Sequence, residues 1–206
     1  MRKHAIVTMA LAIALAVPVI APAAEAPQSE ATTESEGKEY TFRGIPWGSS
    51  PAEVENSEFV KNHPDFTYTE SEGKLTITDA TVAGKSSAAV LCFGNNGLYS
   101  GMYILSEKHT DLINYYQDFL DLQEALTKKY GEPDETDDDW KNDLYKDKPS
   151  KYGMAVGAGH VKFIRRWKGE DSVITLGCVG DNFEISNAIY YQSISLQPKE
   201  TEDDGL

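Results

Sequence analysis

A turn signal between two apolar segments constrains the fold of this 206-residue chain more than any other feature. The signal is Asn95-Asn96-Gly97, with apolar segments at residues 88–93 and 98–105 on either side. Asn-Gly between apolar segments is the strongest short-range sign of a β-hairpin, because both turn residues need a positive φ. The turn therefore predicts two paired antiparallel strands.

Other segments carry strand-like patterning. Alternation of apolar and polar residues is typical of strands with one buried face. Further strands are predicted at residues 40–45, 66–69, 75–78, 161–167, 173–179 and 188–196. Residues 134–160, acidic at first and then rich in glycine, have no clear pattern.

One long amphipathic helix is predicted over residues 110–130. Lys128 and Lys129 suit its negative end, and Gly131 and Pro133 end it. Apolar side chains at helical spacing form one face. They are Leu112, Tyr116, Phe119, Leu126 and Tyr130, flanked by Ile113 and Leu120.

A short helix is predicted to begin at Pro51, after the segment Pro46-Trp47-Gly48. Ser50 is a good N-cap, and Glu53 stands where it completes a capping box. Pro51 suits the first helical position, because its missing N–H would have no partner there.

Together these elements predict an α+β fold. Hairpins dominate, so we expect a mostly antiparallel sheet with a short and a long helix packed on one face. Each helix is followed by strands, which suggests two degenerate helix-plus-strands halves, although no residue-level self-similarity is evident. We expect a single α+β domain over residues 39–198.

The segment from Phe42 to Val54, F-R-G-I-P-W-G-S-S-P-A-E-V, resembles the opening of many uncharacterised exported bacterial proteins. The Asn-Gly hairpin and the end of the long helix fit the same pattern, and the likeness spans roughly residues 40–196. The architecture is similar to the helix-plus-antiparallel-sheet modules of β-lactamase-inhibitor proteins and small outer-membrane assembly lipoproteins. The resemblance brings no functional residue with it, because likeness of fold does not imply function.

The N-terminus has the pattern of a cleavable secretory signal. A basic start is followed by an apolar run and by Ala21-Pro22-Ala23, which fits the small-x-small rule of signal peptidases. We expect cleavage between Ala23 and Ala24, with residues 1–23 as the signal peptide and the rest exported to the periplasm or the extracellular space. An uncleaved anchor is the alternative, but the run is short for a span of about 20 residues.

Two tails flank the predicted domain. Residues 24–38 and 199–206 are acidic and have almost no large apolar side chain. Such segments do not bury enough apolar surface to offset the entropy of ordering. We therefore expect a disordered acidic linker before the domain and an acidic tail after it.

The charge of the chain excludes some partners. There are 33 acidic and 19 basic residues, a net charge of −14. Loss of Arg2 and Lys3 with the signal would leave 17 basic against 33 acidic residues, a net charge of −16. Such a field repels nucleic acid and anionic lipid surfaces, so we expect neither as a partner, and no membrane insertion after cleavage.

No recognised catalytic motif is present in the sequence. Ser35 and Ser71 each begin a Ser-x-x-Lys segment, but the companion Ser-Asp-Asn and Lys-Thr-Gly elements are missing. The three histidines outside the signal, His63, His109 and His160, have no metal-ligand spacing. We therefore assign no catalytic, cofactor-binding or metal-binding residue, and no cofactor.

Acidic residues cluster at positions 134–139. Clustered carboxylates suit a hard cation, but the glycine and terminal glutamate of an EF-hand loop are missing. We expect a solvated acidic loop, with a calcium site as the less favoured alternative.

The two cysteines, Cys92 and Cys178, lie in predicted strands. An oxidising compartment and an even count favour a disulfide between them. Two buried free thiols, which behave as small apolar side chains, are the alternative.

Tyrosine is abundant and points to a contact surface. Tyr99, Tyr103, Tyr190 and Tyr191 lie in predicted strands whose outward face is free to meet a partner. Tyrosine is enriched in protein interfaces. We therefore expect a non-catalytic exported module that binds a protein or a cell-envelope component. The acidic charge of the chain would favour a partner with a basic surface. A secreted hydrolase with an unrecognised carboxylate site is the first alternative, and a carrier of a small ligand or metal is the second.

Overall fold

A computed structural model describes residues 38–198 of the chain. The predicted signal peptide at residues 1–23, its cleavage site between Ala23 and Ala24, the linker up to residue 37 and the tail at residues 199–206 lie outside the described residues. Within residues 38–198 the four α-helices are α1 (Pro51–Glu55), α2 (Glu58–Lys61), α3 (Ile113–Tyr130) and α4 (Tyr152–Gly157). The strands are β1 (Thr67–Thr69), β2 (Lys74–Val82), β3 (Lys85–Gly94), β4 (Gly97–Leu105), β5 (Glu135–Trp140), β6 (Val161–Lys168), β7 (Ser172–Asp181) and β8 (Glu184–Ser193). Short 3-10 turns occur at Glu70–Glu72, Asp143–Tyr145 and Pro149–Lys151.

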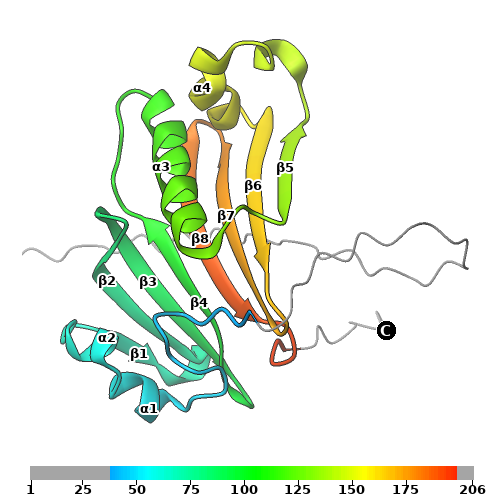
Figure 1. The fold of residues 1–206 in the computed structure, drawn as a ribbon. Coiled ribbons are helices and arrows are strands. Elements are labelled where there is room, and N and C mark those ends of the chain that lie inside the picture. The colour runs from blue at the N-terminus through cyan, green and yellow to red at the C-terminus, as the bar shows by residue number, and fades with distance from the viewer. Residues whose placement is uncertain (1–37, 199–206) are drawn as a thin grey trace, which may run out of the picture. The chain divides into compact units, whose positions relative to one another are not determined.

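The eight strands of the described part of the chain form one antiparallel sheet in the order β1-β2-β3-β4-β8-β7-β6-β5. This order is symmetric: β1 to β4 make one half, β5 to β8 make the other, and β4 pairs with β8 at the centre (Figure 1). Helices precede the strands in each half, with α1 and α2 before β1 and α3 before β5. The predicted α+β fold is therefore confirmed. In the described residues no helix is long and apolar enough to cross a membrane.

The predicted hairpin is present as β3 and β4, but its turn differs from the expected one. Gly94 pairs with Gly97 across the turn, and of the turn residues only Gly97 has a positive φ, at 88°. The Trp47-Gly48 segment packs against this hairpin, because the Gly48 amide donates to the Leu98 carbonyl and the Leu98 amide donates to the Ser49 carbonyl, both at 2.8 Å. A side chain at position 97 would strike the Gly48 backbone.

Residues 40–45 were predicted to form a strand, and this prediction is wrong. The chain reverses at Arg43 and Gly44, which have φ of 53° and 75°, and the Ile45 amide donates to the Phe42 carbonyl at 3.0 Å. The only bridge of this segment in the described chain joins Phe42 to Ile45. Because the segment folds back on itself, it lies over the sheet instead of joining it.

Helix α1 begins as its sequence predicts. The Ser50 hydroxyl accepts from the Glu53 amide, and the Glu53 carboxylate accepts from the Ser50 amide at 2.7 Å. The capping box and Pro51 at the first turn are confirmed. The helix turns Val54 fully into the core.

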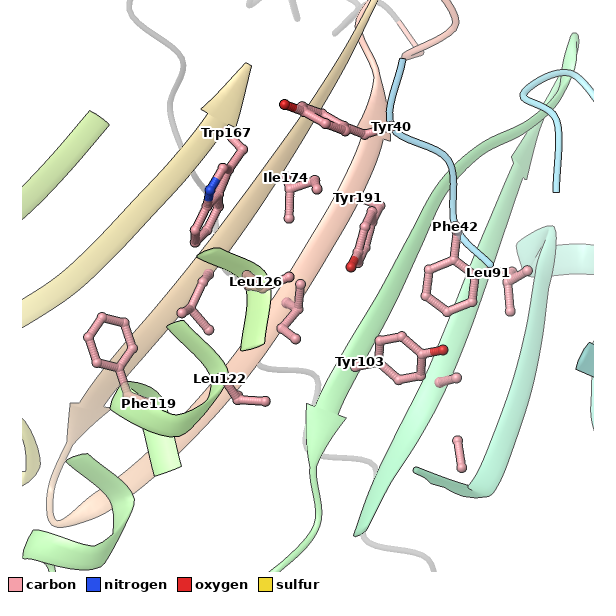
Figure 2. Packing of buried hydrophobic residues seen from close by; sticks show 14 of the residues in the cluster. Tyr40, Phe42, Leu91, Tyr103, Phe119, Leu122, Leu126, Trp167, Ile174 and Tyr191 are labelled. Atoms are coloured by element: carbon pink, nitrogen blue, oxygen red, sulfur yellow. The ribbon is translucent and has the colours of Figure 1, made fainter. Parts of the chain in front are cut away.

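The long helix α3 packs on one face of the sheet, here called the inner face (Figure 1). It buries Phe119, Leu122 and Leu126 against side chains of β7 and β8 (Figure 2). On the other half of the sheet, Phe42 and the short helices supply the covering side chains, including Val54 and Val60. Helix α4 adds Ala155 and Val156 to the core beside α3, so three separate pieces of chain cover the inner face.

Residues 134–160, which had no clear pattern, contain β5 and α4. Strand β5 pairs with β6 at the edge of the sheet, and α4 contacts α3 and β7. The expected acidic loop at residues 134–139 is therefore an edge strand, because its carboxylates find basic partners on β6: Asp138 binds Arg165 at 2.7 Å and Glu135 binds Arg166 at 3.3 Å.

Candidate functional site

The four tyrosines proposed as an interface do not share one face. Tyr191 pairs with Gly101 and Tyr103 pairs with Ile189, and these positions lie on the inner face with the core. Tyr190 pairs with Met102, so it lies on the opposite, outer face. Of the four, Tyr103 and Tyr191 are buried, whereas Tyr99 and Tyr190 are half-buried.

The reason is the two-residue period of a strand. Adjacent residues point to opposite faces, so Tyr190 and Tyr191 cannot both face outward. Tyr99 and Tyr103, four residues apart, would share a face in a regular strand. A bulge occurs at Tyr99 itself: Cys92 pairs with Ser100 and Phe93 with Leu98, so Tyr99 is the extra residue of β4 and lies beside Cys92.

The centre of the outer face of the sheet is mostly apolar, and several of its residues are small. Its central positions carry no charge across β3, β4, β8, β7 and the middle of β6. The residues are Ala88, Val90, Cys92, Met102, Ile104, Ala188, Tyr190, Val173, Thr175, Gly177 and Ile164. Within residues 38–198 no helix packs over them (Figure 1).

Charged side chains stand at the β5–β6 edge of the outer face. Glu135 binds both Arg166, at 3.3 Å, and Lys168. The hydrogen bond from Lys168 is the largest cause that lowers the pKa of Glu135. On this side the apolar centre is bordered by charged residues: Glu135, Arg166 and Lys168 bind one another, and Asp137 of β5 stands opposite Ile164.

Cys92, Tyr99 and Tyr190 form a cluster on the outer face. Burial raises the pKa of the Cys92 thiol and that of the Tyr190 hydroxyl. Burial, followed by the neighbouring Cys92 and Tyr190, raises the pKa of Tyr99 to about 12. These groups stay neutral at ordinary pH, so the cluster offers a thiol and two phenol hydroxyls without charge.

The predicted Cys92–Cys178 disulfide is wrong for this fold, because both cysteines are free. Cys92 lies on the outer face of β3, and Cys178 pairs with core residue Phe163 on the inner face of β7. Strands β4 and β8 lie between them, which places the two strands roughly 14 Å apart. A disulfide needs Cα atoms within about 7 Å.

The inner face contains a pocket of about 190 Å³ between α3, the turn at residues 42–45 and the β2–β3 turn. Tyr103 and Tyr191 reach it from the sheet, on the side where Leu122 and Leu126 project from α3 (Figure 2). Arg43 and Lys129 are its charged lining residues, and Tyr130 also lines it. The sequence gives no sign that Arg43 and Lys129 line one pocket, because they belong to segments far apart in the chain.

A polar network lies at one end of the inner face. The Asp118 carboxylate is 2.6 Å from His109 Nε2 and accepts from Lys85 Nζ at 2.7 Å, and Lys85 also donates to Asp121 at 2.8 Å. Burial opposes the charge on Lys85, but these two carboxylates outweigh it and raise its pKa. Asp118 was missed although its place on the buried face of the long helix was a signal. Lys85 is shared by both carboxylates, so the network joins α3 to the first residue of β3.

The remaining metal and catalytic candidates do not come together. His63, His109 and His160 lie in different parts of the fold. In the described part of the chain no three acidic, histidine or cysteine side chains are placed to hold a metal ion, and this includes the acidic positions 134–139.

Comparisons with known proteins give no relative. A scan against protein-family models, a search of curated proteins and a search of solved structures each return no match.

Proposed function

We propose that the protein is an exported, non-catalytic module that binds a partner protein of the cell envelope through the outer face of its sheet. The observation that supports this proposal most is the contrast between the faces: α3, α4 and the segment from Phe42 to α2 cover the inner face, and no described helix covers the outer one.

The chemistry of the outer face fits a protein partner. Its centre is uncharged and contains Met102, Tyr99 and Tyr190. The cores of protein interfaces are depleted in charge and enriched in tyrosine and methionine. Because the outer face belongs to a continuous antiparallel sheet, it presents these side chains on a rigid support.

Charge defines the surface that a partner should have. The chain carries a net charge of −14, and an acidic field speeds the encounter with a basic partner. We therefore expect a partner surface that is apolar where it meets Met102 and Tyr190 and basic around that centre. Export is proposed from the N-terminal signal pattern and from the resemblance of the Phe42–Val54 segment to exported bacterial proteins.

Site-specific photocrosslinking tests the outer face directly. A photoreactive amino acid is placed at Met102 or Tyr190, and at Leu144 as a control, in the full chain expressed in its own cell. Leu144 is 57% exposed and lies in the 3-10 turn Asp143–Tyr145, away from the outer face. We expect one protein to be crosslinked from both outer-face positions and not from Leu144.

A charge substitution then tests binding of that protein in purified form. Met102→Glu places a charge at the apolar centre and should abolish binding, whereas Leu144→Glu adds the same charge elsewhere and should leave binding unchanged. Equal crosslinking from Leu144, or unchanged binding by Met102→Glu, contradicts the proposal. Hydrolysis of an envelope polymer or peptide that is lost on a single carboxylate substitution would favour the hydrolase instead.

A further inference from the structure

We propose that the pocket on the inner face binds a small organic carboxylate whose apolar body is a short branched or aromatic group. This site is separate from the outer face and does not depend on the protein-binding proposal. Arg43 and Lys129 would bind the carboxylate, and apolar side chains of α3 and β8 would contact the body of the ligand.

The pocket arises from the way the two halves are covered. Helix α3 covers the half that contains β7 and β8, and Phe42 with the short helices covers the other half. The two covering pieces meet over the central strands β4 and β8, where the pocket of about 190 Å³ remains. Tyr103 of β4 and Tyr191 of β8 lie beneath this seam (Figure 2).

The charge of the pocket is opposite to that of the chain. The chain has a net charge of −14, yet the pocket is lined by Arg43 and Lys129 and by no acidic residue. Neither cation forms an ion pair with a carboxylate of residues 38–198. Two unpaired cations at one pocket attract an anion, and the acidic surroundings make the pocket a local exception.

Arg43 is held in place by contacts that leave some of its N–H groups free to donate. Its Nε donates to the Tyr103 hydroxyl and one Nη2 hydrogen is donated to the Thr81 carbonyl at 2.7 Å. Its guanidinium also lies 5.1 Å from the ring centroid of Phe59. A guanidinium has five N–H donors, so three remain for a ligand.

The backbone at Arg43 adds a second indication. Its φ of 53° is in the left-handed region, which is uncommon for a residue with a long side chain. Such a conformation persists only where the surroundings enforce it, and it occurs often at binding sites. Here the turn from Phe42 to Ile45 enforces it and directs Arg43 to the pocket.

Tyr103 and Tyr191 remain neutral donors at the pocket. Burial is the main cause that raises the pKa of Tyr103 and of Tyr191. Because Arg43 donates to the Tyr103 oxygen, the Tyr103 proton is available for an acceptor. Lys129 Nζ lies 4.8 Å from the Tyr130 ring centroid at the same rim. The rim thus offers cationic and neutral donors to one anionic group.

The rest of the lining decides the class of ligand. Val82, Leu122, Leu126 and Ile189 are apolar and give the pocket a floor that a bare inorganic anion would not use. Pockets for drug-sized ligands measure about 300–1,000 Å³. At about 190 Å³, this one suits a carboxylate with a single ring or a short branched chain.

Titration of the full chain with phenylacetate, followed by amide chemical shifts in NMR, tests the proposal. We expect saturable shifts at Arg43 and at the α3 residues of the pocket. Phenylacetamide, which has the same shape without the charge, and inorganic phosphate, which has charge without an apolar body, should each bind at least about tenfold more weakly. The peptide Gly-Gly-Phe shows whether the carboxylate can come from a peptide end or only from a free acid.

Three variants locate the site. Lys129→Gln and Arg43→Asn should each weaken phenylacetate binding by roughly tenfold, which is typical for loss of a charged hydrogen-bond partner. Lys128→Gln removes a neighbouring exposed charge that does not line the pocket, and should leave binding unchanged. Asparagine tolerates a left-handed φ, so Arg43→Asn should fold, and a single cooperative thermal transition checks this.

The proposal is overturned by several outcomes. These are no saturable binding of phenylacetate at millimolar concentration, equal weakening by Lys128→Gln, or binding of phosphate or phenylacetamide as tight as that of phenylacetate. Lys129→Gln lies on an exposed helix position, so loss of folding cannot imitate its effect.

Discussion

The two faces of the sheet are built from the same strands and the same residue types, but they have different roles. Tyr190 and Tyr191 are neighbours in β8, yet Tyr191 is packed near Phe42 in the core and Tyr190 lies on the outer face, which no helix of residues 38–198 covers. The same holds for the cysteines, since Cys178 is fully buried on the inner face and Cys92 is half-buried on the outer one. Residue type therefore does not set the role of these side chains. The covering layer does.

The largest expected difference in stability between the faces is at the adjacent residues Tyr190 and Tyr191. Tyr191→Ala removes a ring whose centroid lies 5.7 Å from that of Phe42, and should lower the free energy of unfolding by about 3–5 kcal/mol. Tyr190→Ala should cost no more than about 1.5 kcal/mol, because its ring is not enclosed by a covering layer. Urea unfolding of both variants measures the difference. Equal losses would mean that the outer face is covered in solution.

Two glycines give a smaller contrast, in which a side-chain atom is added instead of removed. A Cβ at Gly101, on the inner face, would overlap the Phe42 ring, whereas one at Gly177, on the outer face, would meet only the mobile end of Ile164 at 3.3 Å. Gly101→Ala should therefore destabilise by about 1–3 kcal/mol through overpacking. Gly177→Ala should stay within about 0.5 kcal/mol. Thermal melts of both variants decide, and a larger loss at Gly177 would contradict the assignment of faces.

Ion pairs give a smaller contrast still. Lys85 binds Asp121 near the inner face, and Lys168 binds Glu135 at the edge of the outer face. The hydrogen bond from the lysine is the first cause that lowers the carboxyl pKa in each pair. Because the folded pKa is depressed, each carboxylate stabilises the fold above its ordinary pKa of 3.8 or 4.5, and this contribution is lost as the pH falls through the folded pKa.

The size of that contribution should follow burial of the lysine. The Lys85 side chain is 17% exposed and that of Lys168 is 55% exposed, so the inner pair is less screened by water. Both carboxylates are more than one-third exposed, and we expect less than about 1 kcal/mol from either. Asp121→Asn should reduce the stability difference between about pH 7 and about pH 3 more than Glu135→Gln does, in urea unfolding at both values. A larger reduction by Glu135→Gln would contradict this order.

Local signals predicted the elements well. The Asn-Gly hairpin, the capping box at Ser50 and the long helix were all recognisable, because each depends on residues close in sequence. The edge strand β5 was missed, since its residues are acidic and only the basic residues of β6 explain why they pair. Residues 40–45 have strand-like composition, but the left-handed turn at Arg43 and Gly44 prevents pairing.

The site required information that local patterns lack. Arg43 and Lys129 meet only because α3 ends beside the turn at residues 42–45. The faces of the cysteines depend on a one-residue offset between similar hairpins, Cys92-Phe-Gly-Asn-Asn and Cys178-Val-Gly-Asp-Asn. In the first, Gly94 closes the turn, and in the second Asp181 does, so Cys92 stands two residues and Cys178 three residues before the closing pair. A one-residue shift changes the face of every side chain.

The smallest expected effect, and the sharpest test of the faces, concerns these two thiols. Because Cys92 and Cys178 lie on opposite faces with two strands between them, a reducing agent should leave the thermal midpoint of the purified chain unchanged. A disulfide that closed this long loop would instead lower the midpoint on reduction, because its loss would cost roughly 4 kcal/mol.

Labelling with a thiol reagent distinguishes the two cysteines further. Cys92 should react slowly in the folded protein, since burial raises its pKa and only the thiolate reacts, and Cys178 should react only after unfolding, because it is fully buried. Cys92→Ala and Cys178→Ala identify which thiol reacts first, and early reaction of Cys178 would mean that the inner face opens in the native state.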